Sequence, residues 1–213
     1  MRTADTLEVV EVFRSLQGEG QRTGRVTTFV RLAGCDLACP WCDTDHKMRE
    51  LVTVSDLVER VGRLGPTGWV CITGGEPGVH DRLPMLVDWL KRSGYKVQVE
   101  TNGLVIDLAL AGLFDLVTVS PKLHLGRKVA RLIEEVRQMS NTELKVVVDQ
   151  HERPWFNLLL DGWRDDSFFD CPIYLQPMSC GPEETRRCVN FVEKMGRESV
   201  RLSLQVQKIL SIP

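Results

Sequence analysis

Segments with the pattern of a β-strand alternate with segments with the pattern of an α-helix along nearly the whole chain. Runs of apolar and β-branched residues predict strands, and apolar residues three or four positions apart predict helices. The predicted strands are 26–33, 69–73, 95–101, 116–119, 143–148, 173–175 and 200–206, and the predicted helices are 52–64, 83–91, 127–139, 152–163 and 182–195. Thr53 and Asp56 form a capping pattern at the start of the first helix. This alternation is typical of a parallel sheet covered by helices.

Glycine, cysteine and polar residues follow several of the predicted strands directly. They are Gly34-Cys35, Thr73-Gly74-Gly75-Glu76, Glu100-Thr101-Asn102, Ser120-Pro121-Lys122 and Gln176-Pro177. The carboxyl ends of parallel strands meet at one edge of the sheet, and ligands bind there. We therefore expect one curved sheet to gather these residues into a single active site.

The length suggests one domain or two small ones, and we expect a single domain over residues 1–213. The formal net charge is −2 and 43% of the residues are hydrophobic, which argues against a strong nucleic-acid-binding or membrane-binding surface. The chain contains no run of about 18 apolar residues that would span a membrane. Residues 1–10 lack the apolar core of an export signal, so we expect a cytoplasmic protein.

The seven cysteines are an odd number, and three of them form the spacing C-x3-C-x2-C at Cys35, Cys39 and Cys42. Three thiolates this close repel one another unless a metal compensates their charge. Three readings remain open from the residues alone: an iron–sulfur cluster with one open iron that binds a small molecule, a zinc site with His46 as fourth ligand, or unligated buried cysteines. Cys71, inside a predicted strand, is expected in the core.

The cysteine spacing, with Trp41 directly before Cys42, resembles the radical S-adenosylmethionine (SAM) enzymes, and the segment 74–77 resembles the motif that holds the SAM amino group in them. More of the chain resembles the 7-carboxy-7-deazaguanine synthase family within that superfamily. The similar segments are 17–20, 29–35, 41–44, 72–77, 100–103, 119–122, 175–177 and 202–205. They are spread over most of the sequence.

The resemblance implies an α/β fold, an incomplete (β/α) barrel of the radical SAM type that is reduced relative to a full (β/α)6 core. It implies a lyase that contracts the ring of 6-carboxy-5,6,7,8-tetrahydropterin to 7-carboxy-7-deazaguanine and releases ammonia, in queuosine-type 7-deazapurine biosynthesis. The cofactors it implies are a [4Fe-4S] cluster, SAM and Mg2+. It also implies a homodimer that receives electrons from flavodoxin or ferredoxin.

The resemblance assigns roles to individual residues. The cluster ligands are Cys35, Cys39 and Cys42, and the Mg2+ ligand is Thr44; the SAM-binding residues are Trp41, Cys42, Asp43, Gly74, Gly75, Glu76, Glu100, Ser120, Pro121, Lys122 and Gln176; the substrate-binding residues are Leu16, Gln17, Gly18, Glu19, Arg31, Thr73, Gln207 and Pro213. Glu19 and Gln207 are the expected catalytic residues. An arginine fork suits a substrate carboxylate, and a hydroxyl oxygen suits Mg2+. Without the resemblance, Thr44 reads as an ordinary turn residue.

Gln207 departs from the family pattern, in which a histidine often stands at this position. Glutamine donates and accepts hydrogen bonds but carries no proton at neutral pH. We therefore expect Gln207 only to orient the substrate.

Two other functions compete with this interpretation. A glycyl-radical activating enzyme shares the cysteine motif but has no reason to contain the segments 17–20 and 41–44. A zinc-binding interaction module needs none of Glu100, Lys122 and Gln176 at strand ends. Iron and acid-labile sulfide analysis separates the zinc module from the enzymes.

Overall fold

The computed structural model describes residues 5–148 and 171–213. Within them a mixed sheet has the strand order β3-β1-β2-β4-β5-β6-β7-β8-β9. The strands are β1 (Thr6–Leu16), β2 (Val26–Leu32), β3 (Glu50–Thr53), β4 (Trp69–Gly74), β5 (Lys96–Thr101), β6 (Leu116–Val119), β7 (Thr142–Val148), β8 (Ile173–Pro177) and β9 (Val200–Leu202). β1 pairs antiparallel with β2 and β3, and every pairing from β2 to β9 is parallel.

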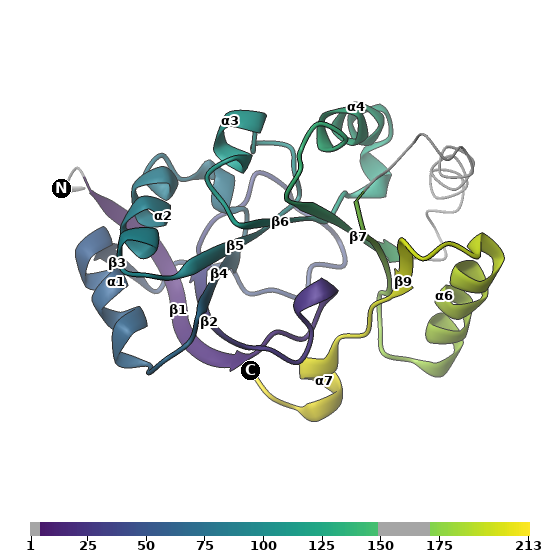
Figure 1. Cartoon of the computed structure of the whole chain (residues 1–213), viewed down its shortest axis with the longest axis horizontal. Helices are drawn as coiled ribbons and strands as arrows, with labels where there is room; N and C mark the ends of the chain where they lie inside the picture. The colour runs from purple at the N-terminus through teal and green to yellow at the C-terminus, as the bar shows by residue number, and fades with distance from the viewer. Residues whose placement is uncertain (1–4, 149–170) are drawn as a thin grey trace.

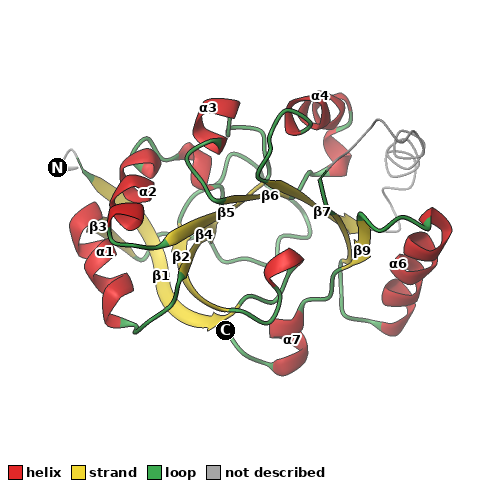
Figure 2. Cartoon of the chain, in the orientation of Figure 1, coloured by secondary structure: helices red, strands yellow, loops and turns green. Residues whose placement is uncertain are grey.

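The sheet curls into an open barrel with helices on its outer face (Figures 1 and 2). The outer helices are α1 (Val54–Arg63), α2 (Leu83–Arg92), α3 (Leu108–Ala111), α4 (Arg127–Val136) and α6 (Pro182–Met195), and the short helix α7 (Val206–Leu210) follows β9. β3 and β9 are the two edges of the sheet and do not pair with each other. The expected incomplete barrel is therefore confirmed. None of the described helices is long and apolar enough to cross a membrane.

Burial explains why these segments adopt their structures. All of β6 is buried, as expected for a strand covered on both faces. α1 instead buries one stripe, which includes Leu57 and Val61. The Thr53 hydroxyl accepts a hydrogen bond from the Asp56 backbone N–H at 3.1 Å, which confirms the predicted cap and closes the first turn of α1.

Three predicted boundaries need correction, and the strands β1 and β3 and the short helix α3 were not predicted. The predicted helix 127–139 ends at Val136 as α4. The predicted helix 52–64 begins later, because residues 52 and 53 belong to the edge strand β3. The predicted strand 200–206 ends at Leu202, and the chain then turns into α7. β1 was not predicted at all: the pairing register shifts between Val9 and Glu11, and such a bulge disrupts the alternation that marks a strand. The predicted helix 152–163 lies outside the described residues.

We expect Leu57→Ala to lower the free energy of unfolding by about 2–5 kcal/mol, because the fully buried side chain leaves a cavity between α1 and the sheet. Leu51→Ala is the matched control, since Leu51 on β3 is 43% exposed and should change stability by no more than about 0.5 kcal/mol. Urea denaturation followed by circular dichroism measures both. Equal losses in the two variants would contradict this account of the core.

Candidate active site

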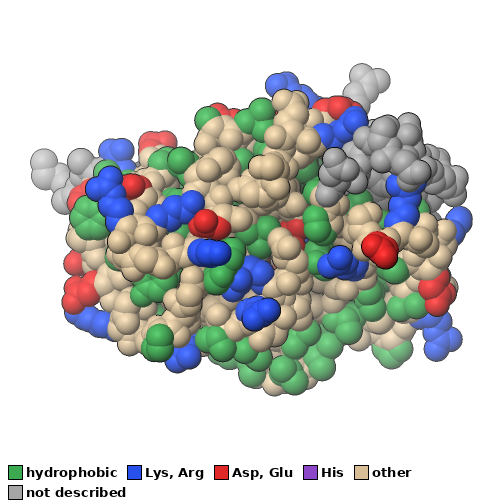
Figure 3. Space-filling model, in the orientation of Figure 1, with side chains coloured by type: hydrophobic (Ala, Val, Ile, Leu, Met, Phe, Trp, Pro, Cys, Tyr) green, Lys and Arg blue, Asp and Glu red, His purple; other side chains and the backbone are tan. Residues whose placement is uncertain are grey.

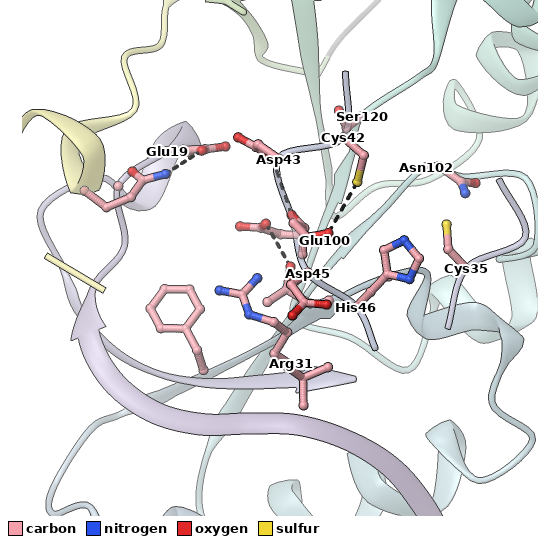
Figure 4. Close-up of a pocket in the computed structure, with 18 of the residues that line it drawn as sticks. Glu19, Arg31, Cys35, Cys42, Asp43, Asp45, His46, Glu100, Asn102 and Ser120 are labelled. Carbon is pink, nitrogen blue, oxygen red and sulfur yellow. Dashed lines mark hydrogen bonds between the residues drawn. The ribbon is translucent and has the colours of Figure 1, made fainter. Parts of the chain in front are cut away.

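A cavity of about 580 Å³ lies at the carboxyl ends of the parallel strands. Its volume is in the range of small-molecule sites. It is lined by these predicted site residues: Leu16, Gln17, Gly18, Glu19, Arg31, Cys35, Cys39, Trp41, Cys42, Asp43, Thr44, Thr73, Gly74, Gly75, Glu100, Ser120, Lys122, Gln176, Gln207 and Pro213. Only Glu76 and Pro121 among the predicted set do not line it. Figure 4 shows the thiols of Cys35 and Cys42 on one side of the cavity and Glu19 on the other.

The cysteines lie on the long loop between β2 and β3. Cys35 and Cys39 are half-buried, Cys42 is exposed, and none of the three forms a disulfide bond. The loop is closed at its base, where the Gly34 N–H donates to the His46 carbonyl at 3.0 Å. Burial raises the pKa of the Cys35 thiol. In residues 5–148 and 171–213, no three Cys, His, Asp or Glu side chains converge closely enough to hold a single ion.

The end of β4 packs its backbone directly against the cysteine loop. A Cβ atom on Gly75 would lie 1.6 Å from the Gly34 carbonyl oxygen, and one on Gly74 would lie 2.0 Å from the Leu32 carbonyl oxygen. Gly74 also has a φ of 131°, a conformation that favours glycine. The Glu76 N–H donates to the Gly34 carbonyl at 2.9 Å. Residues without side chains are therefore needed where β4 supports this loop.

Glu76 lies beneath the cavity floor and is fully buried. Its carboxylate accepts hydrogen bonds from the Thr101 hydroxyl, the Asn102 N–H and the Gly78 N–H at 2.7, 2.7 and 3.0 Å. Burial raises the pKa of Glu76 despite these donors. The Asn102 amide in turn donates to Asp36 at 2.8 Å. In this structure Glu76 therefore ties β5 to the segment beside the cysteines.

We call the part of the cavity lined by Gln17, Glu19, Glu100, Lys145 and Gln207 the inner wall. Gln17 and Glu100 form the centre of a polar network on it. The Gln17 amide donates to Glu100 Oε1 at 3.0 Å, and the Thr73 hydroxyl donates to Glu100 Oε2 at 3.2 Å. The Gln17 side-chain oxygen accepts from the Glu19 N–H at 3.2 Å. The fully buried Cys71 lies 3.8 Å from the Gln17 amide nitrogen, so its predicted core position is confirmed. Glu100, predicted on the SAM side, thus directly contacts two predicted substrate residues.

Glu19 is held by donors from two distant parts of the chain. Lys145 on β7 forms an ion pair with Oε2, and the amides of Gln207 and Gln205 donate to Oε1 at 2.8 and 3.1 Å. Burial alone would raise the pKa of Glu19, but the Lys145 charge and these hydrogen bonds outweigh it and lower the pKa to about 2. Glu19 is therefore a carboxylate at every physiological pH.

The segment after β9 packs against the part of the cavity wall that holds Glu19. The Val206 N–H donates to the Gly18 carbonyl at 3.2 Å, and a Cβ atom on Gly18 would lie 1.7 Å from the Gln207 side-chain oxygen. That oxygen is buried without a hydrogen-bond partner, as is the side-chain oxygen of Gln205. Pro213 lines the same wall, where its carbonyl accepts a hydrogen bond from Ser15 Oγ at 2.6 Å. A bound molecule with N–H groups could satisfy the Gln207 oxygen.

Arg31 lines the outer part of the cavity and lies near the carboxyl end of β2. Its Nε donates to Glu11 at 2.7 Å, and its guanidinium carbon lies 5.6 Å from the centre of the Phe13 ring. Phe13 stacks on Phe29, with 5.0 Å between the ring centroids. β1 thus supplies an acidic partner and an aromatic face that orient the guanidinium.

The opposite end of the cavity holds residues predicted to bind SAM. The Trp41 ring meets the edge of His124 with centroids 4.8 Å apart, and Gln176 accepts from Ser203 at 3.2 Å. Lys122 donates to the Ser120 hydroxyl at 3.2 Å, and burial together with the positive charge of Lys145 lowers the pKa of Lys122. These side chains come from separate strand ends, as the predicted single site requires.

Asp43 and Thr44 follow the last cysteine and face the same cavity. The Thr44 hydroxyl donates to Asp43 Oδ1 at 3.4 Å, and Asp43 forms an ion pair with Lys208 on α7. Burial would raise the pKa of Asp43, but the Lys208 contact lowers it overall. Oxygen donors thus lie beside the cysteines, and α7 is attached to the cysteine loop.

Sequence reasoning missed Lys145 and Gln205. Glu143 and Lys145 are two positions apart on β7, so both face the barrel interior. The available signal was the presence of two charged residues in the strand TELKVVV. Lys145 lies in mid-strand, whereas most of the predicted site residues lie at strand ends or in the loops that follow them. Gln205 lay inside the predicted final strand, and only the turn after Leu202 brings it to Glu19.

Comparison with known proteins gives concordant results. A profile of the radical SAM superfamily matches residues 29–146. A 7-carboxy-7-deazaguanine synthase from Synechocystis sp. is 41% identical over 214 residues, which cover 96% of this chain and 92% of the relative. The one from Escherichia coli K12 is 34% identical over 225 residues, with coverage of 95% and 97%. The crystal structure of QueE from Escherichia coli matches with a TM-score of 0.72, 31% identity and 94% coverage of both chains.

We expect Gly75→Ala to impair assembly of an iron–sulfur cluster on the cysteine loop. Its Cβ would overlap the Gly34 carbonyl oxygen, so the backbone that supports the loop must move, and we expect roughly fivefold less bound iron. Gly68→Ala is the matched control, because a Cβ there meets nothing within 4 Å. Iron and acid-labile sulfide are measured after anaerobic reconstitution, with circular dichroism to verify folding. Full iron content in Gly75→Ala would refute this role of the glycine.

Proposed function

Because this chain belongs to the 7-carboxy-7-deazaguanine synthase family of the radical SAM superfamily, we propose that the cavity described above is its active site. The reaction is the ring contraction of 6-carboxy-5,6,7,8-tetrahydropterin to 7-carboxy-7-deazaguanine with loss of ammonia. The observation that supports this placement most directly is that thiols, oxygen donors and a forked arginine line one cavity of about 580 Å³.

The residues at the cysteine end fit a [4Fe-4S] cluster with SAM beside it. Cys35, Cys39 and Cys42 all line the cavity and form no disulfide bond, and three thiolates leave one iron open for a small ligand. Gly74 and Gly75 present bare backbone next to them. In our assignment, Cys35, Cys39 and Cys42 hold the cluster, and Gly75, Ser120, Lys122, Trp41 and Gln176 bind SAM.

The cluster and SAM, when bound, supply the radical chemistry, and the protein supplies binding and orientation. The stacked rings of Phe13 and Phe29 and the residues Gln207 and Lys208 of α7 line this cavity. Glu100 accepts hydrogen bonds from both Gln17 and Thr73, so it joins the two predicted binding regions. We assign it to the boundary where substrate and SAM meet.

The inner wall suits the pterin ring. The 2-amino and N3–H groups of a pterin are neighbouring hydrogen-bond donors, and Glu19 is an anionic acceptor whose pKa is lowered to about 2 by Lys145 and the glutamine donors against the effect of burial. The unpaired oxygen of Gln207 is a second acceptor on the same wall. Arg31 lies at the outer part of the cavity and suits the substrate carboxylate.

Mg2+ completes the proposal. The Thr44 hydroxyl and the Asp43 carboxylate lie together in the cavity wall, and hard oxygen ligands are the donors that Mg2+ prefers. We assign Thr44 as the protein ligand. Thr44 would hold the ion, and Arg31 would bind the substrate carboxylate.

The partners we propose are flavodoxin or ferredoxin as electron donor and a second copy of this chain, in the cytoplasm. Ile209 and Leu210 on α7 are more than half exposed, and Figure 3 shows apolar side chains gathered along the lower edge of this face, beside α6 and α7. Apolar patches of this kind mark surfaces that a partner covers.

A product assay tests the reaction. Reconstituted protein with SAM, a reductant, Mg2+ and 6-carboxytetrahydropterin should form 7-carboxy-7-deazaguanine, detected by mass spectrometry. Cys35→Ala, Cys39→Ala and Cys42→Ala should each form none, because two thiolates do not hold the cluster. Cys180→Ala is the control, since Cys180 lies outside the cavity. Cleavage of SAM without the deazaguanine product would mean that the substrate assignment is wrong.

Gln207→His should keep kcat/KM within about threefold of wild type, because a histidine N–H can also donate to Glu19. Its pH profile should stay flat between about pH 6.5 and 8, since the proposed role is a hydrogen bond and not proton transfer. Gln207→Leu removes the donor and should lower kcat/KM about tenfold or more, as expected for a hydrogen bond to a charged group. A large gain in rate or a new titration in Gln207→His would argue that an acid–base group belongs at this position.

A further inference from the structure

Lys145 is the buried ammonium of the inner wall, and no role has so far been assigned to it. It lies on β7 and lines the cavity with only 8% of its surface exposed. Its Nζ forms an ion pair with Glu19 and lies 3.8 Å from Glu100 Oε2. A buried lysine is rare unless it is paired. Here one ammonium serves two carboxylates, one from the segment after β1 and the other from the end of β5.

The neighbouring residue on the same face of β7 supports the same segment. Glu143 accepts a hydrogen bond from the Gln21 N–H at 2.9 Å and from the Thr118 hydroxyl at 2.8 Å. A Cβ atom on Gly20 would lie 2.2 Å from the Glu143 carboxylate. β7 thus contacts the backbone beside Glu19 through Glu143 and the side chain of Glu19 through Lys145.

The charge balance shows what Lys145 contributes. Burial alone would raise the pKa of Glu19, and the Lys145 charge is the largest influence opposing it. Burial would lower the pKa of Lys145, but Glu100 and Glu19 raise it well above its ordinary value. The other titratable groups whose charges act on this pair are Cys71, Glu143, Lys122 and Asp43. Of Lys145 and these four groups, all within the described residues, only Lys145 contacts the carboxylates of both Glu19 and Glu100.

The charge state of Glu19 decides what the wall can bind. As a carboxylate it accepts hydrogen bonds from the amino and ring N–H groups of a pterin. As a carboxylic acid it would present its own donor to those donors and leave one of them unpaired, which costs affinity.

We propose that Lys145 is a positioning residue that orients Glu19 and Glu100 as acceptors for the donor edge of the substrate ring, and so determines selectivity for an N–H-rich heterocycle. This inference rests on the proposed function for the identity of the ring. It differs from a purely structural role, in which Lys145 would contribute to stability but not to the pH dependence of ligand binding.

The test measures equilibrium binding of 6-carboxypterin, an oxidised and fluorescent analogue, to reconstituted protein between pH 6 and 9. Wild type should bind with an affinity that Glu19 does not make pH-dependent in this range. Lys145→Met should weaken binding about 100-fold near pH 7, as when one partner of a buried charge pair is removed. Without the Lys145 charge the pKa of Glu19 is higher than in wild type. The affinity of the variant should therefore fall further as the pH drops, because protonation of Glu19 removes the acceptor.

Three further variants separate positioning from structure. Lys145→Arg should restore most of the affinity because it keeps the charge. In a Glu19→Gln background, Lys145→Met should add no more than about a threefold loss, since the two act through one interaction. Lys194→Met, at an exposed position of α6, is the control and should bind as wild type. Iron content and circular dichroism are measured for each variant, and Lys145→Gln replaces Lys145→Met if the latter does not fold.

Wild-type affinity with a flat pH profile in Lys145→Met would overturn the proposal, as would fully multiplicative losses in the double variant. Failure of the proposed role of Lys145 can be distinguished from failure of the proposed function. If wild type forms no deazaguanine but binds 6-carboxypterin in this Lys145-dependent manner, the reaction is wrong and the role of Lys145 stands. If wild type forms the product and Lys145→Met has an unchanged KM, the role of Lys145 is wrong and the reaction stands.

Discussion

Parallel pairing is the constraint on which the rest of this structure depends. Every strand from β2 to β9 runs in the same direction, so each delivers its carboxyl end to one rim of the curved sheet. The cysteine loop leaves β2 at that rim, and the glycines that end β4 pack against its base. The cavity lies at that rim, and its lining comes from the strand ends, the cysteine loop and α7.

Three ion pairs balance charges within the cavity. Arg31 pairs with Glu11, Asp43 with Lys208, and Glu19 with Lys145. The first two pairs are partly exposed, whereas the third is buried and costly to break. Ligands at the outer part of the cavity can therefore exchange partners with Arg31 or Asp43 at low cost. The inner wall is preorganised, which is the property expected where a site discriminates between ring systems.

The fold was predictable from the sequence where periodicity was regular and not where it was broken. The parallel strands and the helices α1, α2, α4 and α6 followed from apolar spacing, whereas the four-residue helix α3 was not predicted. The Thr53 cap was confirmed by its hydrogen bond. β1 escaped prediction because its bulge disrupts alternation. β3 escaped because it is only four residues long and its last two residues were assigned to the helix that follows. The turn of the chain after Leu202 depends on contacts with the segment around Gly18, which is far away in sequence. The local sequence pattern therefore could not predict this turn.

The sequence by itself determined the α/β class and the single rim of functional residues, because strand periodicity and strand-end residues are local properties. The comparisons then established the family from similarity along nearly the whole chain. Only the tertiary structure decided that Glu19 meets Lys145, Gln205 and Gln207, and that Glu100 contacts Gln17 and Thr73. The physical reason is that the free energy of a buried charge depends on which groups surround it in space, and the partners of Glu19 come from a strand and a turn more than a hundred residues away in sequence.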